Sequence, residues 1–329
     1  MKKLYTLLFL ALTSSLSFAQ ATDPFLGTGS LNANGWSTHS GTAAQLTIVS
    51  GSIPYAGMTS AGNKVALVAG NSEDVNLASA AALTGVAYYS AILNVPNTTG
   101  LHPTAVAGDY SIALGGTAGA SVTSLPARIY FRTGTVANTF NIGVLNNSGG
   151  TATPTYAATD YPVGTPLFVV VKYDFATNTA SLFVNPALDG AEPAATVTNA
   201  TGTTLAPAQI ASVVLRQAGT AATGTGNVEY DNIRVGGTYS YVTTSVLGVK
   251  QNAIAGLSIY PNPVVNGILY IDTNANADKK VVIYNVLGKQ VLSTTTSENS
   301  INVGSLNNGI YIVKVTEEGK TATRKLVIR

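Results

Sequence analysis

The chain alternates short runs of β-branched, aromatic and other apolar residues with stretches rich in glycine, proline, asparagine and threonine. Runs of this length bounded by turn residues predict β-strands. In the first 242 residues the runs occupy positions 45–49, 64–69, 86–95, 110–114, 128–132, 140–145, 167–175, 180–184, 210–216 and 227–235. The one helix candidate is 73–83, which its β-branched and small residues weaken. We therefore expect an all-β protein whose main part is a jelly-roll β-sandwich of two packed sheets.

Two of these runs predict a specific pairing. Residues 168–171 are continuously apolar, which is typical of a strand covered on both faces. The next run, 180–184, follows after the short turn 176–179. This spacing predicts an antiparallel hairpin near the centre of a sheet.

The N-terminus has the three parts of a secretory signal peptide. Lys2 and Lys3 precede the apolar stretch 4–16, and the small residues Ser17 and Ala19 precede Gln20. We expect residues 1–19 to be removed by cleavage before Gln20. No later segment approaches the roughly 20 apolar residues of a spanning helix, so the mature chain is predicted to lack a transmembrane segment.

Composition excludes several function classes. The chain has no cysteine, which excludes disulfides, a thiol nucleophile, a cysteine-based zinc site and lipid attachment at a lipobox cysteine. Residues 20–249 hold six basic and ten acidic side chains, whereas residues 250–329 hold nine basic and five acidic ones. The main part therefore has no basic excess that would indicate nucleic acid as a partner.

The last part of the chain has its own set of strand-like runs. They lie at 257–263, 267–271, 281–291, 309–315 and 325–329, and turns rich in glycine and asparagine separate them. This pattern predicts a small Ig-like β-sandwich.

Four features of this part are characteristic of one family. They are the opening motif Tyr260-Pro261-Asn262-Pro263, the block 283–289 that ends in Gly288 and Lys289, the strand 309–315 with Gly309 and Tyr311, and a basic C-terminus. Residues 257–329 resemble the type A C-terminal sorting domain of the type IX (Por) secretion system. The resemblance implies Sec export to the periplasm and then passage through the outer membrane by the type IX machinery as partner. It also implies cleavage, here in a linker at 243–256, and a protein that is released or attached to the cell surface.

A second resemblance concerns the predicted domain at 20–242. Residues 168–175, 180–186 and 229–236, together with 88–90, are similar to the second half of a laminin G-like (concanavalin A-like) jelly roll. This fold hosts lectins, glycoside hydrolases, lyases and structural modules, so it does not determine function.

The candidate site residues are few. Glu229 and Asp231 stand two positions apart on one predicted strand, so they share a face. They begin the pattern Glu-x-Asp-x-x-Glu of jelly-roll glycosidases, but Ile233 and Arg234 follow, and the second catalytic carboxylate is missing. We therefore predict no catalytic residue, and we take Trp36, Glu229 and Asp231 as ligand-binding candidates. Tyr55, Tyr156 and Tyr161 are further aromatic side chains that a sugar could contact.

No cofactor is expected. His39 and His102 are far apart, and neither has a second metal-type ligand at helical or strand spacing, so no metal site is predicted. A structural calcium ion at the oxygen-rich turns 71–74 or 189–192 stays open, although neither matches a defined calcium loop.

Three functions stay open at this stage. The first is a non-enzymatic secreted or cell-surface module that binds glycan or another surface partner. The second is an enzyme, a glycoside hydrolase or lyase, that degrades extracellular polysaccharide. The third is a structural component of the surface or matrix.

Overall fold

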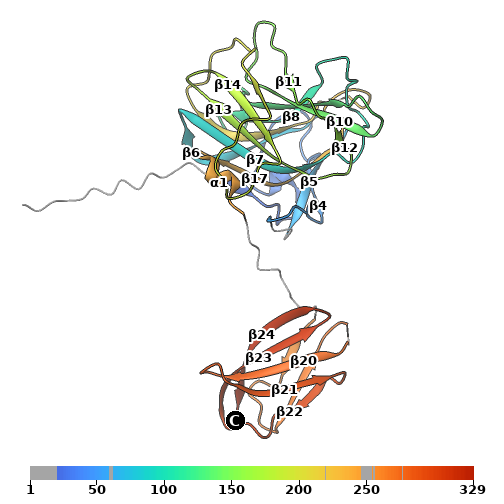
Figure 1. The fold of residues 1–329 in the computed structure, drawn as a ribbon, viewed down its shortest axis with the longest axis vertical. Coiled ribbons are helices and arrows are strands. Elements are labelled where there is room, and N and C mark those ends of the chain that lie inside the picture. Colours follow the sequence, from blue (N-terminus) through green and yellow to red (C-terminus); the bar gives the residue numbers. More distant parts are fainter. Residues whose placement is uncertain (1–20, 59–61, 219, 246–253, 255, 276) are drawn as a thin grey trace, which may run out of the picture. The chain divides into compact units, whose positions relative to one another are not determined.

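The computed structural model describes residues 21–58, 62–218, 220–245, 254, 256–275 and 277–329. The predicted signal peptide, its cleavage position and most of the predicted linker lie outside these residues. The chain divides into two compact units, Met1–Gly248 and Val249–Arg329 (Figure 1).

The first unit is built from two antiparallel sheets. Within the described residues the nine-stranded sheet has the order β15-β14-β13-β7-β17-β5-β4-β2, and β1 pairs with β17. Its strands are β1 Ala21–Asp23, β2 Gly29–Ser30, β4 Thr47–Ser50, β5 Asn63–Leu67, β7 Val86–Asn94, β13 Leu167–Asp174, β14 Thr179–Val184, β15 Val197–Asn199 and β17 Val228–Gly236.

The eight-stranded sheet packs against it, with the order β11-β10-β9-β8-β16-β6-β3 and with β12 paired to β10. Its strands are β3 Ser37–Ser40, β6 Asp74–Leu83, β8 Asp109–Gly115, β9 Arg128–Thr133, β10 Thr139–Leu145, β11 Thr155–Tyr156, β12 Tyr161–Pro162 and β16 Ile210–Arg216. These strand positions confirm the predicted all-β sandwich.

The main core lies between the two sheets, where alternate residues of each strand point inward. On β9, for example, Ile129 and Phe131 are fully buried in this core, while Arg128, Tyr130 and Arg132 are partly exposed on the opposite face. The outward face of the eight-stranded sheet is therefore lined by the other alternate set of side chains.

The nine-stranded sheet is covered on both faces. A second apolar cluster, which includes Ile53, Phe168 and Val242, lies on its outer side. The short helix α1 (Tyr239–Thr243) packs there against β17 and β7 (Figure 1). All four residues 168–171 are buried, and β13 pairs with β14, so the predicted two-sided strand and its hairpin are confirmed.

The helix candidate 73–83 was wrong, because Asp74–Leu83 forms strand β6 between β16 and β3. Val75 and Leu83 of this strand are buried in the main core. The gain from pairing with two neighbouring strands outweighs the local helix propensity of its alanines.

The second unit is a smaller sandwich, as predicted. A three-stranded sheet, β18-β19-β22, consists of Ser258–Tyr260, Ile268–Asp272 and Ser300–Asn302. A four-stranded sheet, β21-β20-β23-β24, consists of Gln290–Thr296, Lys279–Asn285, Gly309–Glu317 and Lys320–Ile328. Apolar side chains such as Leu269, Val281 and Val313 form the core of this unit.

No helix among the described residues is both long enough and apolar enough to cross a membrane.

Candidate functional site

The outward face of the eight-stranded sheet carries a row of three tyrosines. Tyr110 on β8 is directly opposite Tyr130 on β9, Tyr130 is opposite Gly143 on β10, and Gly143 is opposite Tyr156 on β11. All three rings are partly exposed. Burial of part of each ring raises the pKa of the three phenols, so they stay neutral hydrogen-bonding groups at ordinary pH.

Three arginines lie on the same face. The guanidinium carbon of Arg132 is 3.7 Å from the centroid of the Tyr156 ring. The corresponding distances to the Tyr110 ring are 4.8 Å for Arg128 and 4.3 Å for Arg216. Guanidinium groups at these distances are attracted by the negative face of the ring. We call these six side chains, Tyr110, Tyr130, Tyr156, Arg128, Arg132 and Arg216, the Tyr/Arg face.

Hydrogen bonds hold Arg132 in one orientation. Its Nε and Nη2 donate to Oδ1 of Asn141 over 3.3 and 3.1 Å, and its Nη1 donates to the Thr104 carbonyl over 3.0 Å. Asn141 is itself buried and donates to the Ala157 carbonyl. Arg132 is thus preorganised, and a ligand that binds it has little side-chain entropy left to remove.

Acidic groups accompany one of the three arginines. Nη1 of Arg216 is 2.6 Å from Oδ1 of Asp109, and Asp74 stands opposite Arg216 on β6. Burial raises the pKa of Asp74 to about 6, although Gln217 N–H and Arg216 act in the opposite direction. Asp74 is therefore a carboxylate that changes protonation in mildly acidic solution.

Two loops fold onto this face beside the tyrosine row. Gly119 donates its backbone N–H to Asn76 on β6, and Ser212 on β16 donates to the carbonyl of Thr117. Farther along the sheet, Thr104 donates to the carbonyl of Thr133, and Tyr156 Oη donates to that of Ala107. Tyr156 and Arg132 of the Tyr/Arg face thus both contact the loop that contains Thr104 and Ala107.

The structure does not present Trp36 to a ligand. The side chain is 2% exposed, stacks on Phe25 at 6.2 Å and donates its indole N–H to Asp23 over 2.7 Å. Its environment is the main core.

Glu229 and Asp231 lie on the outer side of the nine-stranded sheet. Both carboxylates are bonded there by other residues of the protein. Glu229 forms an ion pair with Lys64 at 2.7 Å and accepts from Asn94 over 2.8 Å. Asp231 is buried, and it accepts the N–H groups of Ile53 and Asn232 over 2.9 and 2.7 Å. Burial raises the pKa of Asp231 to about 6.

Other sequence candidates are also engaged by the protein. Glu73 is buried and accepts from Thr38, Ala44 and Leu46. Glu192 bonds Lys172 and Tyr88, and Asp189 accepts from Ser245. Among the described residues, no group of three or more His, Asp or Glu side chains has a geometry suited to a metal ion.

The histidines and the other aromatic candidates lie at separate places. His39, on β3, is 3.3 Å from Asn76 beside the Tyr/Arg face, and burial lowers its pKa. His102 lies in a loop and accepts from Thr133 through its backbone carbonyl. Tyr55 packs on Phe168 and Tyr161 on Phe140. Tyr156 is the aromatic candidate from the sequence that belongs to the Tyr/Arg face.

Part of the Tyr/Arg face was visible in the sequence. The five residues Arg128-Ile129-Tyr130-Phe131-Arg132 alternate apolar and polar, which places both arginines and Tyr130 on the solvent side of one strand. Tyr110, Tyr156 and Arg216 come from distant strands, and their positions beside these residues depend on strand order.

In the second unit the predicted sorting motif has a structural role. Asn262 donates to the Lys325 carbonyl over 2.8 Å and accepts the Val327 N–H over 2.9 Å, so its side chain bonds the opening segment to the last strand. Tyr260 stacks on Tyr270, and its hydroxyl donates to Asp272. Pro261 and Pro263 flank Asn262.

The remaining motif residues shape turns and core. Gly288, with φ +80°, forms the turn between β20 and β21, and the Asn285 side chain accepts the N–H of the exposed Lys289 there. Gly309 begins β23, and the buried Tyr311 donates to the Asn307 carbonyl.

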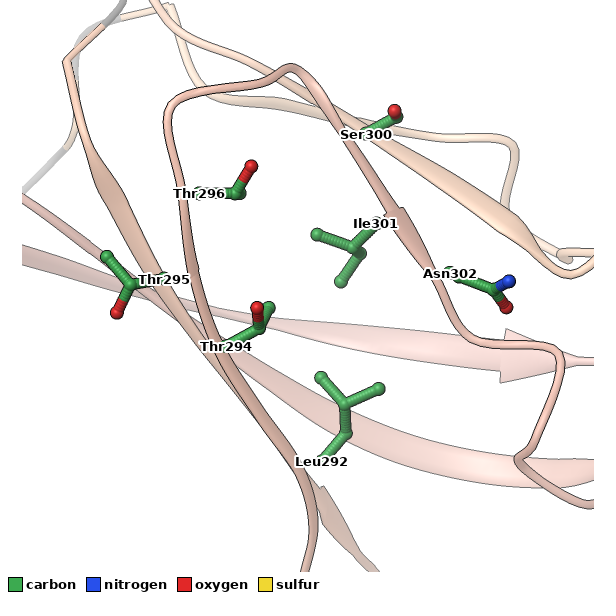
Figure 2. Close-up of a pocket in the computed structure, with 7 residues that line it drawn as sticks. All are labelled: Leu292, Thr294, Thr295, Thr296, Ser300, Ile301 and Asn302. Carbon is green, nitrogen blue, oxygen red and sulfur yellow. The ribbon is translucent and has the colours of Figure 1, made fainter.

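A groove of about 420 Å³ lies between β21 and β22 of this unit. Figure 2 shows the side chains of Leu292, Thr294 and Ile301 around the space between the two strands. The lining contains no charged side chain, so the groove carries no group for acid–base or metal chemistry.

Comparison with known proteins assigns the second unit. Residues 258–329 match the family model described as the secretion system C-terminal sorting domain. An ulvan lyase of Nonlabens ulvanivorans is 36% identical over 89 residues, which are 26% of this chain and 16% of that enzyme. The chain therefore aligns with only a small part of the length of this curated relative.

Solved structures with similarity to the chain have low identity. Peanut lectin has a TM-score of 0.39 and 11% identity, and the match covers 67% of this chain and 96% of the lectin. A protein of unknown function from Shewanella oneidensis has a TM-score of 0.38 and 16% identity, and the match covers 72% of this chain and 93% of that protein. A heptameric pentraxin of Limulus polyphemus has a TM-score of 0.34 and 12% identity, and the match covers 54% of this chain and 79% of the pentraxin.

These findings define an all-β secreted protein with a large sandwich ahead of a sorting domain. More particularly, the sorting domain at 258–329 is that of the type IX secretion system, which delivers the protein to the cell surface or the medium. The predicted sorting domain and localisation are confirmed.

Proposed function

We propose that the first unit is a non-enzymatic module that binds a polysaccharide through the Tyr/Arg face outside the cell. The observation that supports it is the row Tyr110, Tyr130 and Tyr156, which places three partly exposed rings on adjacent parts of one sheet. Aromatic faces flanked by polar groups suit sugar rings, which have an apolar face and a polar rim. The proposal includes the division of the mature chain into a jelly-roll domain at residues 20–242, a linker at 243–256 and the sorting domain at 257–329.

The surroundings of the row favour binding over catalysis. Of the two carboxylates beside Arg216, Asp109 is held in an ion pair at 2.6 Å, and Asp74 accepts the Gln217 N–H over 3.0 Å. Glycosidases need two carboxyl groups on opposite sides of the scissile bond. Glu229 and Asp231, the acids that the sequence suggested, lie on the other sheet and bond Lys64 and Ile53.

A second candidate is an enzyme that degrades extracellular polysaccharide. It is favoured by the name of the curated relative, an ulvan lyase, over the aligned 89 residues. This candidate requires release of cleaved product, so one assay can separate the two.

The experiment uses the mature chain, residues 20–329, on a panel of insoluble and soluble polysaccharides, and it scores retention and product release together. We expect retention without release. Replacing Tyr130 by Ala should weaken retention about two- to tenfold, since an aromatic contact contributes about 0.5–1.5 kcal/mol. Tyr55→Ala, which changes a partly buried loop tyrosine that packs against the other sheet, is the matched control and should leave retention unchanged.

Glu229→Gln should also leave retention unchanged. Released oligosaccharide from the wild type would favour the enzyme instead. No retention on any polymer would contradict the proposal and favour a structural component of the surface.

A further inference from the structure

We infer that the polysaccharide bound by the Tyr/Arg face is acidic and carries carboxylate or sulfate groups that Arg128 and Arg132 bind. This inference rests on the proposed function and specifies its ligand class. It follows from the charge that the fold collects on this face.

The first step is the distribution of basic residues. Residues 20–249 contain six basic and ten acidic side chains, yet three of the six are the arginines of the Tyr/Arg face. Lys64 and Lys172 form ion pairs with Glu229 and Glu192 elsewhere. An acidic unit thus places half of its basic side chains on one partly exposed face.

The second step is the pairing of these arginines. Arg216 has a carboxylate partner, Asp109, at 2.6 Å. Within the described residues, neither Arg128 nor Arg132 has a carboxylate within ion-pair distance. Arg128 donates Nε to the Leu125 carbonyl, and Arg132 bonds the neutral groups of Asn141 and Thr104.

The acid whose charge acts on Arg132 is Asp160. The pKa of Asp160 is lowered mainly by hydrogen bonds from Thr135 and to a smaller extent by Arg132. Its Oδ2 accepts the N–H and the hydroxyl of Thr135, both over 2.6 Å. Asp160 therefore attracts Arg132 from a distance without occupying its donors.

The third step is geometry. Arg132 is in contact with the ring of Tyr156, and Arg128 with that of Tyr110, at two places on the tyrosine row. A sugar ring that contacts an aromatic side chain there brings its charged substituent near a guanidinium. Guanidinium groups bind carboxylate and sulfate oxygens through parallel N–H donors, and these charge-assisted bonds are stronger than neutral ones.

The test compares pairs of polymers that share a backbone and differ in whether their substituents are charged. The mature chain is titrated by affinity electrophoresis against three pairs: dextran and dextran sulfate, hydroxyethylcellulose and carboxymethylcellulose, and methyl-esterified and de-esterified pectin. We expect at least one charged member to bind about tenfold more tightly than its neutral parent, with affinity falling as salt is added.

Two variants connect this difference to the arginines. Arg128→Gln combined with Arg132→Gln should abolish the preference for the charged polymer, so that the charged and neutral members of each pair bind with equal affinity. Arg132→Lys, which keeps the charge but loses the planar fork, should retain only part of the preference. Lys172→Gln, a cation over the Tyr88 ring on the other sheet, is the control and should have no effect. Fluorescence of Trp36, the single tryptophan, verifies that each variant is folded.

The outcomes separate the inference from the function on which it rests. Equal binding of charged and neutral members would overturn the acidic ligand and leave polysaccharide binding intact. Absence of binding to all six polymers would overturn both. Binding of single-stranded DNA as tightly as of the charged sugars would also overturn the inference, because the face would then recognise charge alone.

Discussion

The guanidinium of Arg132 lies over the ring of Tyr156, with 3.7 Å between the guanidinium carbon and the ring centroid. The two residues belong to β9 and β11, which are separated by β10. Gly143 on β10 is opposite Tyr156, and its missing side chain leaves room for the tyrosine ring. A Cβ at Gly143 would be 2.7 Å from the Thr155 carbonyl oxygen and 2.8 Å from Cδ1 of Tyr156.

This close approach predicts that Gly143→Ala disturbs the Tyr/Arg face. The added methyl group should displace the Tyr156 ring from Arg132 and weaken retention of the polysaccharide about three- to tenfold. Stability of the first unit should fall by about 1–3 kcal/mol, the usual cost of overpacking. Retention assays and urea unfolding followed by Trp36 fluorescence measure the two effects. Gly190→Ala, where the nearest atoms are 3.5 Å away, is the control. Unchanged retention in Gly143→Ala would contradict a role for this contact.

Asp74 predicts a pH dependence of stability. Its pKa is raised by burial from 3.8 to about 6 in the folded state, so the folded protein holds this proton more tightly than the unfolded chain. The cost of ionising it is fully present above about pH 6 and disappears below about pH 4. Asp74→Asn should therefore unfold at higher urea concentration than the wild type at pH 7. Two pKa units correspond to about 3 kcal/mol, and partial exposure reduces the expected gain to about 1 kcal/mol.

Urea titrations at about pH 4 and pH 7, read by Trp36 fluorescence, provide the measurement. The gain should be present at pH 7 and absent at pH 4. An equal gain at both values would mean that ionisation of Asp74 is not its cause. Asp231, whose pKa is also about 6, is present in both proteins and cancels in the comparison.

Asn262 predicts a local weakness in the sorting domain. Asn262→Ala removes the bonds to the Lys325 carbonyl and the Val327 N–H, and should lower the stability of the second unit by about 1–2 kcal/mol. Hydrogen exchange at the Val327 amide should become faster, which NMR can follow. Asn302→Ala removes one local bond, to the Gly304 N–H, and should leave Val327 protected. Unchanged exchange at Val327 in the Asn262 variant would show that this side chain does not hold the last strand.

Lys279 and Glu317 form a buried ion pair, and breaking it is expected to lower the stability of the second unit strongly. Their side chains are 0% and 2% exposed, and 3.7 Å separates Nζ from Oε1. Lys279→Met leaves a buried carboxylate without its cation and should destabilise the second unit by about 3–5 kcal/mol. Adding Glu317→Gln should recover part of this loss, since the amide oxygen still accepts from Thr273 and Ala277.

Calorimetry of the mature chain measures both variants. The transition of the first unit, identified by Trp36 fluorescence, should stay in place and serves as the internal control. A double variant no more stable than Lys279→Met alone would argue against coupling between the two residues.

Most of the strands followed from local pattern. Ten predicted runs in the first unit appear as strands, because alternation of apolar residues and turn punctuation act over a few neighbouring positions. The interval 73–83 was an exception, since its pairing with β16 and β3 involves segments far away in the sequence. The sorting domain was recognisable for a related reason. Its motif residues Asn262 and Tyr311 make specific side-chain hydrogen bonds, and Gly288 adopts a φ of +80° that favours glycine.

The candidate site depended on long-range structure. Trp36, the most obvious sugar-binding residue in the sequence, lies in the core because Phe25 and Asp23 provide its stacking and hydrogen-bond partners. Glu229 became part of an ion pair when β5 brought Lys64 beside β17.

The sequence by itself determined most of the longer strands, which side of β9 carries Arg128, Tyr130 and Arg132, and how the protein leaves the cell. Only the tertiary structure decided that Tyr110, Tyr156 and Arg216 join them on one exposed face. The physical reason is that a strand encodes its own two faces through its alternation, whereas its neighbours in the sheet are selected by packing of the whole core.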